Sequence, residues 1–116
     1  KTRCSMSRDP RLYLEDILES CGKIESYIQD VTQQGFEADP MLIDAVVRNL
    51  EIIGEAAKKV PASTRSDMNN APWREASALR DVLAHDYFGI DLDIIWDVVT
   101  NKLPSLCKEV RSFLSQ

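Results

Sequence analysis

Apolar residues recur along this chain at alternating intervals of three and four, and this spacing restricts the possible folds more than any other feature. One seam, with the intervals 3-4-3-4-3, comprises Leu14, Ile17, Cys21, Ile24, Ile28 and Val31. A second seam comprises Leu42, Val46, Leu50, Ile53, Ala57 and Val60. Because an α-helix turns once in about 3.6 residues, each seam forms one apolar face of a helix. The spacing therefore predicts two long amphipathic helices, over residues 10–34 and 40–60.

Cap and breaker residues indicate where these two helices begin and end. Asp-Pro pairs at 9–10 and 39–40 are typical of an N-cap followed by proline in the first helical turn. Gly35 predicts the end of the first helix, and Pro61 predicts the end of the second. The second helix carries further apolar residues beside its seam, so we expect it to lie at the centre of the fold.

The second half of the chain predicts shorter helices. Residues 61–71 are small and polar, and they are expected to form the longest loop. Pro72 opens a third helix that closes at Phe88-Gly89, and Asp91 caps a fourth that Pro104 breaks or kinks before a last helical segment. The expected buried stripe of the third helix is Trp73, Ala76, Leu79 and Leu83. Since no stretch alternates as a strand does, the sequence predicts an all-α, up-and-down bundle of four to five helices.

Charge and length limit the classes of function. A chain of 116 residues is expected to form one domain that buries its own core. Its net charge of −5 disfavours a general nucleic-acid coat protein, which would normally be basic. Any contact with RNA must then come from a local basic patch, and binding should weaken as salt rises.

Cysteine and histidine usage disfavours a metal site. The three cysteines, Cys4, Cys21 and Cys107, have no CxxC spacing, and the chain holds one histidine. We therefore expect no zinc site and no cofactor. We also expect the thiols to be reduced and the protein to be cytoplasmic. No apolar run is long enough to span a membrane, and no signal peptide is visible. Met6 resembles a natural translation start. Residues 1–5 are therefore expected to be an expression remnant, and residues 6–116 the helical domain.

One polar motif in the third helix can carry chemistry. Arg80 precedes the single histidine, His85, by five positions, and Tyr87 follows it by two. An imidazole transfers protons near neutral pH, and a guanidinium fits phosphate oxygens. A place in the last helical turn, near Asp81 and Asp86, favours the imidazolium form of His85, which makes it a credible proton donor to a leaving oxygen. Arg80 would neutralise the charge that builds up on phosphate.

Structural roles for the same residues remain open at this point. His85 can be a solvated helix-end residue paired with Asp81, and Arg80 an ordinary surface ion-pair partner. Tyr87 can be a half-buried packing residue with an exposed hydroxyl. The aromatic residues Phe88, Trp73 and Trp96 are expected in the core or at an interface.

Several separated stretches resemble one family. Arg80-x4-His85-x-Tyr87 resembles the signature of the HEPN superfamily (higher eukaryotes and prokaryotes nucleotide-binding domain), and in particular its HepT-like branch. The stretches 48–56 (RNLEIIGEA), 72–75 (PWRE) and 79–91 (LRDVLAHDYFGID) are similar to that branch and occur in the right order. The resemblance covers nearly the whole chain from about Arg8.

The resemblance implies a HEPN-type helical bundle that forms a homodimer, and a metal-independent endoribonuclease that is the toxin of a toxin–antitoxin pair. It implies a minimal nucleotidyltransferase as antitoxin partner and RNA as substrate, with no membrane association. Arg80 and His85 carry over as the ribonuclease site, and Tyr87 as the acceptor for AMP added by the partner. Asp81 stands where the family often has asparagine, and Glu55 carries over as a supporting residue of the second helix.

Two other hypotheses compete with this one. The chain can be a non-catalytic module that binds a nucleotide or docks a nucleotidyltransferase through the same cluster, which its acidic charge favours. It can also be a purely structural helical dimer whose polar motif borders the interface.

Overall fold

The computed structural model describes residues 8–85 and 91–116, and at positions 80–82, 84 and 85 it describes the backbone alone. Every regular element in these residues is helical, which confirms the predicted all-α class. In chain order the elements are α1 (Pro10–Ile28), α2 (Gln33–Glu37), α3 (Pro40–Lys59), α4 (Ala62–Ser66), α5 (Trp73–His85), α6 (Leu92–Asp97), a π-helical segment η2 (Val98–Lys102) and α7 (Leu103–Leu114).

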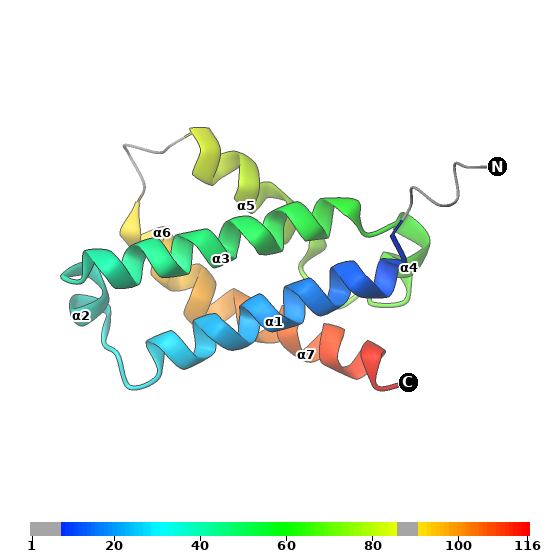
Figure 1. Ribbon diagram of the computed structural model, residues 1–116, viewed down its shortest axis with the longest axis horizontal. Helices are drawn as coiled ribbons and strands as arrows, with labels where there is room; N and C mark the ends of the chain where they lie inside the picture. The colour runs from blue at the N-terminus through cyan, green and yellow to red at the C-terminus, as the bar shows by residue number, and fades with distance from the viewer. Residues whose placement is uncertain (1–7, 86–90) are drawn as a thin grey trace.

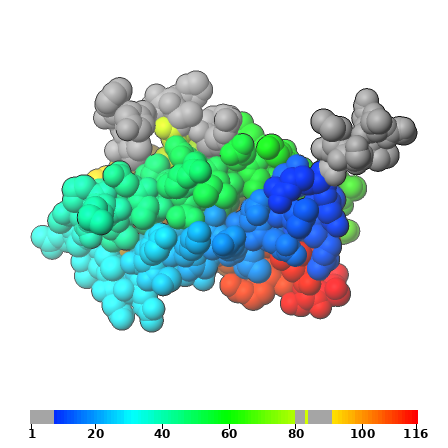
Figure 2. Space-filling view, viewed as in Figure 1, coloured from blue at the N-terminus to red at the C-terminus, as the bar shows by residue number. Residues whose placement is uncertain are grey.

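The second seam lies at the centre of the fold, as predicted. Helix α3 packs against α1 on one side and α5 on the other, and α1 also packs against α7 (Figure 1). Helices α1 and α3 run antiparallel and together cover most of the face seen in Figure 2. The seam side chains of α3 from Val46 to Ala57 are buried, and Leu50 and Ile53 have no exposed surface. Burial of apolar side chains from several helices therefore fixes where α5 lies.

Aspartate caps start three of the helices, as the sequence predicts. The Asp9 carboxylate accepts a hydrogen bond from the Arg11 amide at 2.9 Å, and the Asp39 carboxylate accepts one from the Leu42 amide at 3.1 Å. Asp91 caps α6 by accepting from the Asp93 amide at 2.9 Å. These contacts satisfy amide groups that a helix start leaves without partners.

The prediction of one helix over 10–34 is wrong beyond residue 28. The chain leaves α1 after Ile28, and Asp30 adopts a positive φ of 62°, a left-handed conformation that aspartate tolerates better than most residues. Thr32 then caps α2, because its hydroxyl accepts a hydrogen bond from the Gly35 amide at 3.0 Å. Gly35 is consequently a residue of α2 and does not end α1.

Two further boundaries differ from, or refine, the prediction. The segment 61–71 is not one loop, because it contains the short helix α4. Pro104 lies in the first turn of α7, directly after η2, so the predicted break in the pattern is present as a π-helical segment. Proline cannot donate the backbone hydrogen bond that a continuous helix would require, which accounts for a change of helix geometry here. The predicted end of the third helix at Phe88-Gly89 lies outside the described residues.

Cys21 of α1 and Cys107 of α7 face each other in the core as free thiols. A hydrogen bond to Cys107 and, second, burial raise the pKa of the Cys21 thiol far above its usual range. A thiol in this state stays protonated at neutral pH and is a poor nucleophile. The pair therefore serves as packing between α1 and α7.

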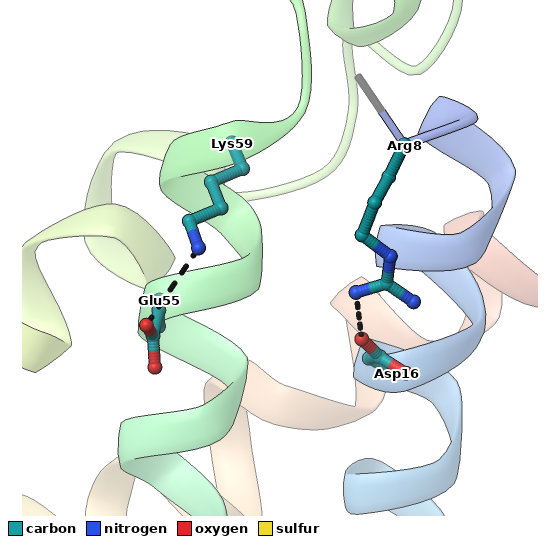
Figure 3. Close-up of polar contacts among 4 residues, drawn as sticks. All are labelled: Arg8, Asp16, Glu55 and Lys59. Carbon is teal, nitrogen blue, oxygen red and sulfur yellow. Dashed lines mark hydrogen bonds and ion pairs between the residues drawn. The ribbon is translucent and has the colours of Figure 1, made fainter. Parts of the chain in front are cut away.

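The outer surface of α1 and α3 is covered by ion pairs. Arg8, just before α1, lies 3.0 Å from Asp16 of α1 (Figure 3), and Arg48 lies 3.8 Å from Glu51 on α3. Pairs this exposed contribute about 0–1 kcal/mol each. None of the described helices is long and apolar enough to cross a lipid bilayer.

Candidate active site

Helix α5 carries the polar motif, and its apolar stripe holds it against the bundle. Trp73, Ala76 and Leu83 are buried, and Leu79 is half-buried, which confirms the predicted stripe. The Trp73 indole Nε1 donates a hydrogen bond to the Met68 carbonyl at 3.1 Å, so the start of α5 is fixed to the segment that precedes it. Packing at both ends of the stripe holds α5, and with it the backbone of the motif, against the bundle.

Arg80, Asp81 and His85 all lie in the C-terminal half of α5. Five residues along an α-helix correspond to about 7.5 Å of rise and about 140° of rotation, which separates the backbone positions of Arg80 and His85. The side chains of all three residues, and Tyr87 as a whole, lie outside the described parts of the structure, so their assigned roles stay predictions.

Glu55 lies on the exposed side of α3. Its carboxylate is 3.7 Å from the Lys59 ammonium, one turn further along the same helix (Figure 3). That ammonium is 6.0 Å from the centre of the Tyr13 ring on α1. The described contact of Glu55 is thus a surface ion pair, and its supporting role at the motif stays a prediction.

Ser77 lies on α5 one turn before Arg80 and Asp81. Its buried Oγ has no hydrogen-bond partner within the described residues. A serine hydroxyl inside a helix usually bonds to a carbonyl one turn earlier. Ser77 is therefore a buried polar group one turn before the motif, at a residue that the sequence interpretation did not single out.

Two hollows lined by described residues border α5. The first is a small apolar cleft of about 30 Å³ between α5, η2 and α7, lined by residues such as Leu79, Val98 and Leu106. The second is an open hollow of about 350 Å³, which we call the α4–α5 depression. It is lined by Ala62, Arg65, Ser66, Asn69, Ala71, Pro72, Trp73, Arg74 and Glu75. Of these two hollows, the depression has both a volume large enough for a small ligand and exposed charged side chains.

Sequence interpretation assigned no role to the two arginines of this depression. Arg65 belongs to a segment that was expected to be a loop, and Arg74 lies at the start of α5, outside the motif. A sequence signal does exist, because both arginines flank Trp73 in an acidic chain. Their proximity, however, depends on the turn between α4 and α5, which periodicity does not reveal.

Within the described residues, no group of three or more His, Cys, Asp or Glu side chains is arranged to hold a metal ion. The cap residues Asp91 and Asp93 lie near one another, but Asp93 accepts a hydrogen bond from the Gln33 amide group at 2.5 Å. This contact ties α6 to α2, so Asp93 has a structural role.

Most of the chain matches one protein family. A family model described as "Ribonuclease HepT-like" matches residues 17–113. No solved structure matches the chain.

Individual relatives are similar over most of the chain. A "Gamma-glutamylcyclotransferase and putative RNase" of Methanocaldococcus jannaschii is 41% identical over 96% of this chain, which spans about 50% of that longer protein. A "putative RNase" of Caldanaerobacter subterraneus subsp. tengcongensis is 39% identical over 94% of this chain and 97% of its own length. A "probable ribonuclease HepT" of Thermococcus cleftensis is 41% identical over 87% of this chain and 92% of its own length.

Proposed function

This chain belongs to the ribonuclease HepT-like family, and on that premise we propose that it is a metal-independent endoribonuclease whose active site is the motif on α5. The observation that carries the proposal is the family match over residues 17–113, which includes Arg80, His85 and Tyr87. Relatives named as RNases match over nearly their whole length, so the similarity is not confined to a shared helix.

The proposed chemistry uses the nucleophile that RNA itself provides. The 2′-hydroxyl loses its proton to solvent and attacks the adjacent phosphorus, the bond to the 5′-oxygen of the next nucleotide breaks, and a 2′,3′-cyclic phosphate remains. His85 donates the proton that the leaving 5′-oxygen takes up, and Arg80 stabilises the negative charge on the phosphate oxygens. Neither step needs a metal ion.

A second copy of the chain would complete the site. One arginine and one histidine, about 140° apart on one helix, offer few groups that can contact a single phosphate. A symmetric dimer would place two motifs along one groove, which offers each phosphate two sets of donors. We propose this homodimer as the active form.

We further propose that the chain is the toxin of a toxin–antitoxin pair. A minimal nucleotidyltransferase would neutralise it by transferring AMP from ATP to the Tyr87 hydroxyl, with release of pyrophosphate. The added phosphate would bring negative charge two residues from His85, where it would repel the RNA backbone.

Purified protein is expected to cleave single-stranded RNA in the presence of EDTA. The measurement is gel analysis of a labelled RNA with the parent, with Arg80→Ala and with Arg111→Ala. Arg111 is the matched control because it is an exposed arginine on α7, away from the motif helix. Loss of activity in Arg80→Ala alone supports the proposal.

Two results would contradict it. Cleavage that requires an added divalent cation would rule out the metal-independent mechanism. Nucleotide binding by calorimetry, with no turnover of any RNA, would favour the non-catalytic binding module.

Co-expression with a minimal nucleotidyltransferase of the proposed antitoxin class is expected to add AMP to Tyr87 and to abolish RNA cleavage. Intact mass and peptide mapping would locate the modification. Tyr87→Phe removes the acceptor oxygen, so it should stay unmodified and active, whereas Tyr27→Phe, on α1, should be modified like the parent. AMP on another residue, or none, would overturn this part of the proposal.

A further inference from the structure

The α4–α5 depression lies where the chain turns from α4 into the helix that carries the motif. Its volume of about 350 Å³ falls within the usual range for small-ligand sites, about 300–1,000 Å³. Its lining mixes two guanidinium groups, the Asn69 amide and small side chains, with Glu75 as its acidic member. A cationic hollow of this size suits one phosphate together with part of the adjoining nucleoside.

Arg65 is fixed in place by the end of α3. Its Nε donates a hydrogen bond to the Val60 carbonyl at 3.0 Å, and one terminal nitrogen donates to the Ala57 carbonyl at 2.8 Å. The guanidinium carbon lies 5.9 Å from the centre of the Trp73 ring. A cation held in this way loses little conformational freedom when an anion arrives, which makes it a preorganised part of a site.

Arg74 supplies the free charge. It is exposed at the start of α5, and its guanidinium has no ion-pair or hydrogen-bond partner among the described residues. Basic residues on the outer faces of α1 and α3 are different, because Arg8, Lys23, Arg48 and Lys59 each lie near a carboxylate. In a chain with a net charge of −5, Arg65 and Arg74 outnumber the one carboxylate of the depression, Glu75, so its lining carries a positive charge that attracts phosphate.

The depression and the motif lie on one helix. Arg74 precedes Arg80 by six residues and His85 by eleven, which corresponds to about 9 Å and about 16 Å along the axis of α5. At a rise of about 3.4 Å per nucleotide, a strand covers these distances in roughly three to five nucleotides. A strand cut at the motif can therefore reach the depression.

We propose that the α4–α5 depression binds the RNA strand a few nucleotides from the cleaved phosphate, with Arg74 and Arg65 on a backbone phosphate and Asn69 beside it. This inference rests on the proposed ribonuclease function and names a second place where the substrate is held. It adds affinity and fixes the direction of the strand, while the reacting atoms remain at the motif.

Arg74→Ala tests the proposal on the full chain. The ligand is a fluorescein-labelled, mixed-sequence 2′-O-methyl RNA of about twelve nucleotides, which lacks the attacking hydroxyl. Fluorescence anisotropy at several salt concentrations is expected to show about three- to tenfold weaker binding at low salt. The slope of log K against log salt should fall in magnitude by about 0.7, the value for one phosphate contact on a single strand.

A second variant and two controls test whether the effect belongs to the depression. Asn69→Asp adds a negative charge at the exposed rim of the depression and should also weaken binding. Gln34→Glu makes the same chemical change on α2, which Figure 1 places at the opposite end of α3 from α4, and should leave binding unchanged. Arg111→Ala controls for the loss of one positive charge.

The outcomes separate this inference from the function on which it rests. If the parent binds and cleaves RNA but Arg74→Ala and Asn69→Asp match it in affinity and salt slope, the depression is not an RNA site and the ribonuclease proposal stands. If Arg111→Ala or Gln34→Glu weakens binding as much as the depression variants do, the effect is one of net charge and the proposed site fails. A parent that neither binds nor cleaves RNA overturns both proposals.

Discussion

His85→Ala is expected to lower the rate of RNA cleavage by about 10²–10⁴-fold, the usual contribution of a positioned general acid or base. The chain has a single histidine, so no neighbouring imidazole can replace it. His85 lies on α5, which is held by the buried residues Ala76 and Leu83, so removal of one side chain should leave the helix in place. Single-turnover cleavage of a labelled RNA measures the effect.

His85→Gln gives a sharper version of this experiment. Glutamine keeps a polar side chain of similar length but cannot donate a proton near neutral pH, so it should be as inactive as alanine. Circular dichroism and sedimentation of each variant would show whether fold and assembly are retained. Cleavage at the parental rate by either folded variant would exclude His85 as the proton donor.

Leu50→Ala is expected to destabilise the protein by about 2–5 kcal/mol. Leu50 has no exposed surface and lies on α3, the helix that packs against both α1 and α5. Its removal leaves a cavity that these helices cannot fill without losing their other contacts. Urea unfolding followed by circular dichroism gives the free energy of unfolding.

Met41→Ala is the matched control for Leu50→Ala. It lies on the same helix but is 83% exposed, so its truncation should change the free energy of unfolding by no more than about 0.5 kcal/mol. Equal effects of the two substitutions would contradict the placement of α3 at the centre of the fold. Because a destabilised bundle also loses its motif geometry, activity of Leu50→Ala should be compared only where it is fully folded.

Ends of helices were predictable where one residue type decides them. Asp9, Asp39 and Asp91 cap helices in the structure because a short carboxylate reaches the free amides of the next turn. The break at Asp30 was missed because a left-handed residue other than glycine is uncommon. Apolar spacing also continued through it to Val31, which packs against the core from outside α1.

The motif could be recognised from its residues, whereas its surroundings could not. Arg80, His85 and Tyr87 stand at spacings that identify the family in the sequence, and the family match confirms that membership. The α4–α5 depression has no such spacing. It forms where Arg65, hydrogen-bonded to carbonyl groups at the end of α3, lies beside the first turn of α5.

Local rules thus determined the helical class, the central seam and the caps, since periodicity and capping act within one or two turns of chain. Tertiary structure alone decided which helices pack on α3, that Cys21 meets Cys107, and that Arg65 and Arg74 share a hollow. The hollow depends on the turn that joins α4 to α5, whereas the other two outcomes depend on contacts between residues far apart in the sequence. Burial of apolar surface selects such contacts for the chain as a whole, and no short stretch of sequence contains them.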